Sequence, residues 1–412
     1  MKKKIFYLIM FSLSIASCLF IMEYVISKYY IPQSDDYYHE FDPLLGWKPI
    51  PGCYEYKPQN SFKSHAIHIN RFGIRNREIG RLRDKDTKRI VVLGDSFTFG
   101  KAVSDEVLFT TVLEHKLNRK KLGAQKYKYE VINTGIPAYG TGQQLLMMKY
   151  LADNDVIGDI YLLMMFTNDL SDNVRLLRNN LFIYAPGFVL DKDGRPVLKY
   201  LPKKNELSNH SEFNDSNRTS NETSGVNATE DFKKFILDLK SKEFFKDRIG
   251  TLLQTSPTIL RFIMKLGIKI DLPGMPTTID SWYNDDILSP GIPLLKALIS
   301  EINQEAHYKN AKLLVALIPS QLEVNPNIFI PIIKENFRGD KKVDQWLKDT
   351  TRPQRITREI CSTIQVPFLD LQPELYKNNN KSLYLFKDGH FNERSHAIAA
   401  ESLAKFILTN EE

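Results

Sequence analysis

Residues 89–100 read RIVVLGDSFTFG, and this stretch decides the fold. Its first half is an apolar run of the kind found in a central strand that is buried on both faces. Gly94-Asp95-Ser96 then predicts a tight turn from strand to helix, which would expose the serine hydroxyl as a nucleophile. A Gly-Asp-Ser triplet occurs by chance in roughly one chain in ten of this length. The interpretation of Ser96 as a nucleophile therefore needs support from other motifs in the chain.

The same alternation of buried strand and amphipathic helix recurs after this stretch. Further strands are predicted at 129–132, 161–166, 313–318 and 367–369, and helices at 104–113, 294–311 and 393–408. Strands that alternate with helices predict an α/β fold, in which helices cover both faces of a parallel sheet.

Composition divides the chain into parts around this core. Residues 31–85 are rich in Pro, Tyr and Gly and predict an extended leader packed on the core. The core itself has two parts, residues 86–175 and 295–412. Between them, 176–294 is expected to be a helical and disordered insertion. Within it, 203–230 hold six Asn, five Ser and three Thr, which is too little apolar surface to offset the ordering entropy.

The N-terminus predicts an export signal. Three lysines at positions 2–4 precede residues 5–22, an 18-residue stretch without a charged side chain. This length is just sufficient for a transmembrane anchor, and the lysines favour keeping that end in the cytoplasm. The rest of the chain is then expected outside the inner membrane, on a single-pass anchor. A cleaved signal peptide and lipidation at Cys18 are the alternatives.

Charge and cysteine content exclude several classes of function. The 412 residues carry a net charge of +7, and 53 − 49 = +4 remains without the first three lysines, which is too little to indicate nucleic-acid binding. Histidine and cysteine spacings predict no metal site, and nothing in the sequence requires a cofactor. His65 and His68 favour a strand, and a Cys53–Cys361 disulfide stays open.

Two further motifs follow predicted strands or precede the last helix. The first is Phe166-Thr167-Asn168-Asp169, in which the side-chain amide of Asn168 can donate a hydrogen bond to an oxyanion. Alternatively, Asn168 or Asp169 caps the next helix. Asp388-Gly389-His390 sets a carboxylate near a histidine that can take a proton from a serine, although a helix-entry turn has the same pattern.

Together, and in this order, the three motifs resemble the SGNH hydrolases, also called the GDSL esterase and lipase superfamily, over 86–175 and 295–412. This resemblance implies a flavodoxin-like three-layer α/β/α sandwich. It also implies the following roles: Ser96 as nucleophile, His390 as general base, Asp388 as its orienting carboxylate, and an oxyanion hole made by the backbone N–H groups of Ser96 and Ala138 and the side chain of Asn168. His396 is expected to be structural.

The chain departs from the family pattern at three positions. Ala138 stands where the family has a glycine, which preserves the N–H donor provided that Ala138 does not need positive φ. Phe166 also replaces a family glycine. Asp388 and His390 are separated by one residue instead of two, as in the branch that acetylates or deacetylates bacterial exopolysaccharides and cell-wall glycans.

Other segments resemble the same branch. Asp42-Pro43, Gly46-Trp47 and residues 70–75 are similar to the leader of its membrane-anchored members, and residues 318–321 also fit it. The resemblance implies an esterase or O-acyltransferase that acts through an acyl-serine on carbohydrate O-acetyl groups. The implied partners are an acylated carbohydrate, the inner membrane and polysaccharide-assembly proteins. An inactive glycan-binding or assembly subunit is the alternative, and the acceptor, acyl donor and oligomeric state stay open.

Overall fold

The computed structural model describes residues 39–56, 64–80, 84–119, 127–174, 185–202, 279, 281–337, 339–385 and 389–411, with eight isolated positions before residue 25. The anchor predicted at 5–22 is largely outside them, and residues 203–230 and Asp388 are wholly outside. Among the described residues, no helix is both long enough and apolar enough to span a membrane.

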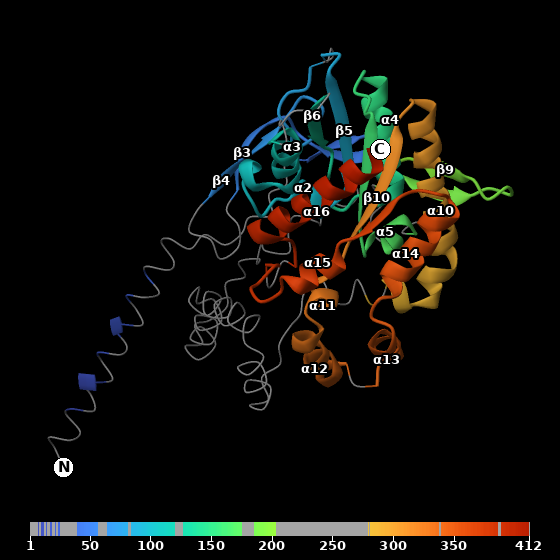
Figure 1. Ribbon diagram of the computed structural model, residues 1–412. Coiled ribbons are helices and arrows are strands. Elements are labelled where there is room, and N and C mark those ends of the chain that lie inside the picture. Colours follow the sequence, from blue (N-terminus) through green and yellow to red (C-terminus); the bar gives the residue numbers. More distant parts are fainter. Residues whose placement is uncertain are drawn as a thin grey trace, which may run out of the picture.

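A five-stranded parallel sheet forms the centre of the molecule (Figure 1). Its strands are β5 (Thr87–Gly94), β6 (Lys128–Asn133), β7 (Ile160–Phe166), β10 (Lys312–Ile318) and β11 (Phe368–Asp370). They lie in the order β6-β5-β7-β10-β11, and every neighbouring pair is parallel. This is the 2-1-3-4-5 order of flavodoxin-like folds. The predicted α/β fold with a parallel sheet is confirmed.

Both faces of the sheet are covered, because the central strands carry apolar side chains on both faces. In β5, Ile90 and Val92 face one layer, whereas Val91 and Leu93 face the other, and all four are fully buried. The first layer contains α3 (Phe109–Arg119), α15 (Gln372–Lys377) and α16 (Glu393–Glu411), and the second contains α4 (Thr141–Asp153), α10 (Asp285–Tyr308) and α14 (Arg352–Thr363). The three layers of the predicted sandwich are therefore present.

Two predicted helices have different bounds in the structure. The helix expected from Ser104 is a 3-10 turn, η1 (Asp105–Val107), followed by α3, because Leu108 is buried in an extended conformation with ψ of 138°. The helix expected from Leu294 begins at Asp285. The Asn284 side chain accepts a hydrogen bond from the backbone N–H of Asp286 and caps it, although two prolines follow within the helix.

The insertion was predicted to be helical and disordered, but it also contains strands. It contains an antiparallel hairpin, β8 (Gly187–Leu190) and β9 (Pro196–Tyr200), which projects from the body in Figure 1. Its turn is formed by Asp191, whose side chain accepts hydrogen bonds from the backbone N–H groups of Asp193 and Arg195, and by Gly194 with φ of +76°. The turn sequence Asp-Gly is a hairpin signal that the composition of the insertion concealed.

A helical segment without a predicted counterpart follows β10. It comprises α11 (Gln321–Val324), α12 (Pro326–Asn336) and α13 (Lys341–Lys348), which lead into α14. Cys361 is buried on α14, whereas Cys53 is exposed on the leader, and both thiols are free. The disulfide left open by the sequence is therefore not formed.

The leader forms two antiparallel hairpins, β1 (His39–Asp42) with β2 (Gly46–Pro49), and β3 (Gly52–Tyr56) with β4 (His65–Ile69). The segment after β4 is tied to the core by Arg75, which is almost fully buried. Its guanidinium donates hydrogen bonds to Asp105 and to the backbone carbonyls of Phe99, Gly100 and Val103. Since these carbonyls follow the serine turn, the leader fixes the loop behind Ser96.

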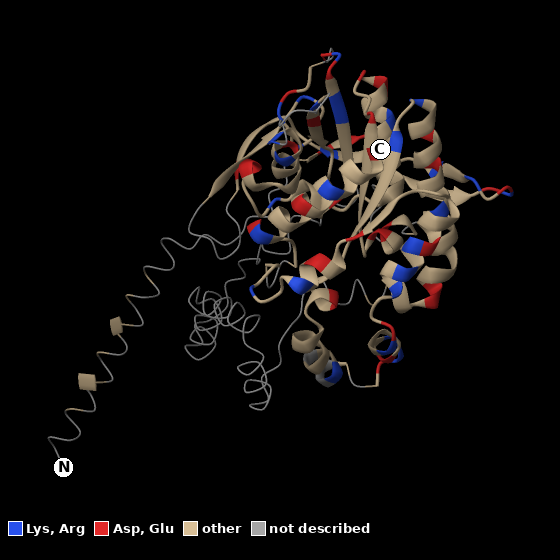
Figure 2. Ribbon diagram, viewed as in Figure 1, with Lys and Arg blue, Asp and Glu red and all other residues tan. Residues whose placement is uncertain are grey.

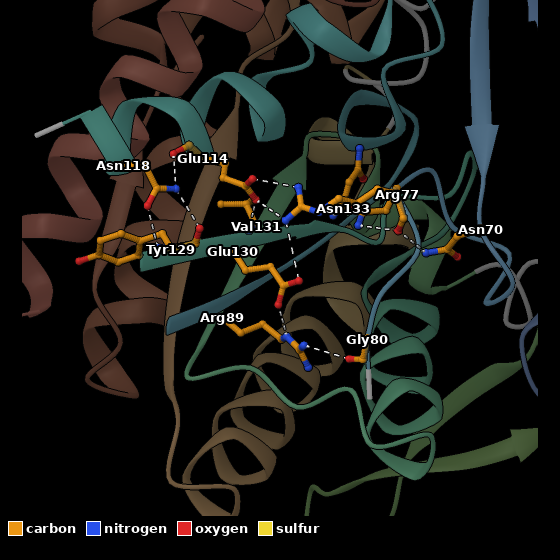
Figure 3. Close-up of polar contacts among 11 residues, drawn as sticks. Asn70, Arg77, Gly80, Arg89, Glu114, Asn118, Tyr129, Glu130, Val131 and Asn133 are labelled. Atoms are coloured by element: carbon orange, nitrogen blue, oxygen red, sulfur yellow. Dashed lines mark hydrogen bonds and ion pairs between the residues drawn. The ribbon is translucent and has the colours of Figure 1, made fainter. Parts of the chain in front are cut away.

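A network of charged side chains extends this attachment (Figure 3). Arg77 pairs with Glu114 of α3 at 2.9 Å and with Glu130 of β6 at 3.8 Å, and Glu130 also pairs with Arg89 of β5 at 2.7 Å. Elsewhere, acidic and basic side chains are intermixed over the described helices, as expected for a small net charge (Figure 2).

The turn after β10 contains a buried carboxyl group. Glu323 closes a capping box with Ser320, accepts the Ser320 backbone N–H at 2.6 Å and accepts the Gln354 amide at 2.7 Å. Burial raises the pKa of Glu323 to about 7, and these hydrogen bonds oppose that shift only in part.

This pKa predicts that stability falls as the pH rises. A carboxyl group with a raised pKa in the folded state binds its proton more tightly there, so its contribution is complete below its unfolded pKa, near 4.5, and is lost through about pH 7. The free energy of unfolding, and with it the melting temperature, should therefore decrease less between pH 5 and pH 8 in Glu323→Gln than in the wild type. The difference in free energy is on the order of 3 kcal/mol. The side-chain amide of Gln354 can rotate by half a turn so that its oxygen, which has no hydrogen-bond partner, accepts the side-chain N–H of the introduced glutamine.

The exposed Glu374→Gln on α15 is the matched control in thermal unfolding at both pH values. An unchanged difference between pH 5 and pH 8 in Glu323→Gln would contradict this account of Glu323.

Candidate active site

Ser96 is the first residue of a single helical turn, α2 (Ser96–Phe99), directly after β5. Asp95 caps this turn, because its side chain accepts the backbone N–H of Phe97 at 2.9 Å. Gly94 is required before it, since an added Cβ would lie 2.1 Å from the Thr98 hydroxyl oxygen. The strand therefore ends in a tight turn that carries Ser96 at its tip, as the sequence predicts.

His390 meets Ser96 from the other end of the chain. Its Nε2 lies 2.7 Å from the Ser96 Oγ, although 294 positions separate the two residues. Gly389, with φ of +75°, makes the turn into His390, and the Leu385 N–H donates to the His390 carbonyl at 2.9 Å. The 2.7 Å between Ser96 Oγ and His390 Nε2 is within hydrogen-bonding reach for proton transfer from the serine to the histidine.

An aromatic cluster holds the imidazole in place. The His390 ring lies 4.7 Å from the Phe97 ring, which in turn packs against Phe166 at 4.1 Å and Phe391 at 5.2 Å. The Phe166 ring fills the space beside Phe97. Asp388, predicted to orient His390, lies outside the described residues, so its role stays a prediction.

Ala138 lies in the loop after β6 and adopts a left-handed conformation with φ of +65°. Alanine was predicted to replace glycine here provided that positive φ is not needed, and the structure has positive φ at this position. This conformation brings the Cβ close to a carbonyl oxygen and costs an alanine about 1–2 kcal/mol. Ala138 therefore has a backbone conformation that favours glycine, and other contacts must offset the strain.

Asn168 follows β7 and occupies the N-cap position of α5 (Asp169–Asn173), but its side chain makes no capping hydrogen bond. Its Nδ2 instead donates to the Asp172 carboxylate at 3.0 Å. The alternative interpretation of Asn168 as a side-chain cap is therefore not supported. Because an amide nitrogen carries two hydrogens, one N–H of Asn168 is left over from this bond.

Two buried carboxyl groups lie behind these residues. Burial raises the pKa of Asp95, which the neighbouring Asp172 raises further, while the Phe97 N–H and His390 act in the opposite direction. The pKa of Asp169 is raised well above its ordinary value by burial and by the charges of Asp95 and Asp172. The raised pKa values favour protonated forms behind the serine turn.

The remaining histidine of this region is structural. His396 is fully buried on α16, stacks on Phe109 with ring centroids 5.8 Å apart, and accepts the Phe109 N–H on Nδ1 at 3.2 Å. Burial lowers the pKa of His396 to about 3, so the ring is neutral at physiological pH. His396 is thus a hydrogen-bond acceptor in the core.

The loop after β10 borders the histidine turn. An added Cβ on Gly389 would lie 4.0 Å from the Gln321 amide nitrogen, and the Tyr384 hydroxyl donates to the Pro319 carbonyl at 2.8 Å.

Among the described residues, no three His, Cys, Asp or Glu side chains are arranged to hold a metal ion. His65 and His68 lie on β4, where His68 pairs with Asp105 at 2.7 Å.

The predicted site residues that the structure describes all lie beyond the carboxyl ends of strands or, for His390, before α16. Ser96 follows β5, Ala138 follows β6 and Asn168 follows β7. In a flavodoxin-like sheet, ligands bind at this edge, where the strand order reverses between the first and third strands. Fold and site together define a flavodoxin-like α/β protein with a serine–histidine pair at its switch point.

No protein-family model and no curated protein matches this chain. Among solved structures, the chain is similar to the acetyl xylan esterase AlAXEase, with 13% identity over 77% of this chain and 98% of that one and a TM-score of 0.33. It is also similar to TesA (11% identity, 78% and 98% covered, TM-score 0.36) and to an aryl esterase of M. smegmatis (16%, 78% and 99%, TM-score 0.34). These TM-scores are low, and the evidence for the function of this chain is the geometry of its own site.

Gly135 sets how closely the loop after β6 approaches the serine turn. An added Cβ on Gly135 would lie 2.4 Å from the Phe99 backbone nitrogen and 2.7 Å from the Thr98 carbonyl carbon. Since backbone atoms cannot move aside cheaply, Gly135→Ala should displace the loop, lowering both the melting temperature and the activity. Gly339→Ala is a comparison variant for backbone strain without a steric clash, because Gly339 has positive φ but no atom within 4 Å of its added Cβ. Wild-type activity in Gly135→Ala would show that steric contact at Gly135 is unimportant.

Proposed function

We propose that this protein is a serine-dependent ester hydrolase or acyltransferase of the SGNH type. The observation that carries the proposal is the 2.7 Å contact between His390 Nε2 and Ser96 Oγ at the switch point of the sheet. A serine hydroxyl is a weak nucleophile by itself, and an adjacent base activates it.

In the first step, the Ser96 Oγ attacks the carbonyl carbon of an ester while His390 Nε2 takes the hydroxyl proton. The oxyanion that forms would accept hydrogen bonds from the backbone N–H groups of Ser96 and Ala138 and from the second N–H of Asn168. Such donors stabilise charge that is present only in the transition state and the intermediate.

In the second step, the intermediate breaks its bond to the leaving alcohol, which receives the proton from His390. Ser96 then carries the acyl group as an ester. His390 next deprotonates a water molecule or a sugar hydroxyl, which attacks the acyl-serine, and Ser96 recovers its proton through His390. Hydrolysis and transfer share every step except the identity of this acceptor.

The substrate is proposed to be an O-acetylated carbohydrate outside the cytoplasm. The resemblance to glycan-modifying members of the SGNH superfamily supports this choice, as does the Asp-X-His spacing at 388–390. The lysines at 2–4, followed by the uncharged stretch 5–22, support a single-pass anchor in the cell membrane with the catalytic part outside. Mass spectrometry of native glycans with and without the gene would test the substrate.

Replacement of the nucleophile should abolish turnover while the fold is kept. Ser96→Ala is expected to reduce hydrolysis of p-nitrophenyl acetate by about 10⁴-fold or more, since the histidine alone cannot form the acyl-enzyme. Ser402→Ala on α16 is the control, and circular dichroism verifies folding. A turnover equal to that of the wild type in Ser96→Ala would exclude the mechanism, whereas failure of an active-site serine probe to label Ser96 in the folded protein would favour an inactive binding subunit.

Loss of one oxyanion donor should act on the chemical step. Asn168→Ala is expected to lower kcat by roughly 100- to 1000-fold with a small change in KM, because the amide contacts charge that the ground-state ester lacks. Asn154→Ala, at an exposed helix end, serves as the control. A large increase in KM at constant kcat would instead assign Asn168 to ground-state binding.

A further inference from the structure

The loop that carries Ala138 is held by the core. Asn133 donates its side-chain amide to the Thr98 carbonyl at 2.8 Å and accepts the Gly135 N–H at 2.9 Å. Beyond Gly135 the loop stays on the core, because the Ile136 N–H donates to the Gly94 carbonyl at 3.3 Å and the side chains of Ile136 and Tyr139 are fully buried. The Tyr139 N–H donates to the Ile136 carbonyl at 3.2 Å, which closes a four-residue turn with the left-handed Ala138 at its third position. Gln144 of α4 also donates to the Tyr139 carbonyl at 3.3 Å. Contacts that hold Pro137 and Tyr139 therefore act on both sides of Ala138.

The leader adds contacts to both neighbours of Ala138. The Trp47 indole Nε1–H donates to the Pro137 carbonyl at 3.2 Å, and the Tyr139 hydroxyl donates to the Trp47 carbonyl. The Trp47 and Tyr139 rings also meet edge to face, with centroids 5.4 Å apart. One leader residue thus binds both neighbours of Ala138, one through its side chain and the other through its backbone and ring.

Trp47 is itself fixed in position. It pairs with Phe41 across the β1–β2 hairpin, whose turn is closed by the Asp42 carboxylate accepting the backbone N–H groups of Leu44 and Leu45. The Leu45 carbonyl accepts the amide of Gln143 on α4 at 2.8 Å, and the Leu45 side chain is fully buried. The hairpin is therefore a rigid support docked on the core.

We infer that Trp47 is a positioning residue of the oxyanion hole, which holds Pro137 and Tyr139 so that Ala138 keeps its left-handed conformation. This inference rests on the proposed function, because it gives the Ala138 N–H the role of an oxyanion donor. It makes the leader a working part of the active site. The segment before the catalytic core would then supply, from outside it, the support for one donor.

Trp47→Phe tests this inference, because it removes the indole donor and keeps an aromatic ring. In the full chain, kcat for p-nitrophenyl acetate is expected to fall about tenfold, the worth of one hydrogen bond that positions a catalytic group, with KM within about twofold. Trp346→Phe on α13 is the matched control. That tryptophan is also fully buried, its indole nitrogen has no hydrogen-bond partner, and its replacement should leave kcat unchanged.

A second substitution separates positioning from general destabilisation. Glycine occupies the left-handed region without the penalty of alanine, so Ala138→Gly should depend less on the support from Trp47. In the double variant, Trp47→Phe is expected to cost about fivefold less in kcat than it does beside Ala138. A merely structural tryptophan would give the same loss in both backgrounds, and that result would overturn the inference.

Hydrogen–deuterium exchange supplies a readout that does not need activity. Peptides covering residues 133–140 are expected to exchange faster in Trp47→Phe than in the wild type, and not in Trp346→Phe. A wild-type protein without Ser96-dependent turnover would refute the proposed function, whereas unchanged exchange in Trp47→Phe would refute the support of the loop by Trp47. Wild-type kcat in Trp47→Phe, with Ser96-dependent turnover intact, would refute the inference alone.

Discussion

The hydrogen bond between Ser96 and His390 is the constraint on which the interpretation of this molecule depends. Two residues 294 positions apart meet at 2.7 Å only because β5 and α16 belong to the same sandwich. The strand delivers the serine at its carboxyl end, and the last helix, packed on the same layer as α3, delivers the histidine at its start. Stability of the sheet and competence of the site are thus coupled through one contact.

Much of this arrangement is predictable from the sequence, because its signals are local and periodic. The continuous apolar runs of β5, β7 and β10 mark buried parallel strands, and the Gly94-Asp95-Ser96 turn marks the serine. What the sequence conceals is non-local. The support of the loop after β6 by Trp47 depends on the docking of the leader, and neither the indole donor nor its carbonyl acceptor has a sequence pattern. The β8–β9 hairpin was missed because a short turn signal lay in a polar insertion.

The positive φ of Ala138 differs physically from the other left-handed residues. Among the described residues, Asp155, Asn310 and Gln365 also have positive φ, but each follows the C-cap of a helix, where a left-handed residue commonly ends the helix. Ala138 follows a strand, is apolar and ends no helix. Its conformation belongs to the turn closed by the Tyr139 N–H and the Ile136 carbonyl, and Trp47 contacts both residues that flank Ala138 in that turn.

Departures from the rules of local stability gather at one edge of the sheet. Beyond the carboxyl ends of β5, β6, β7 and β10 lie a buried Asp95, the strained Ala138, a buried Asp169 and a buried Glu323, each of which costs folding free energy. The ion pairs of Arg77, Arg89 and Glu130 instead tie the leader to β5 and β6 through groups that compensate one another. Natural proteins break local rules chiefly at functional sites and offset the cost elsewhere. This asymmetry is a physical reason to place function at the edge that holds Ser96, and it does not depend on any motif.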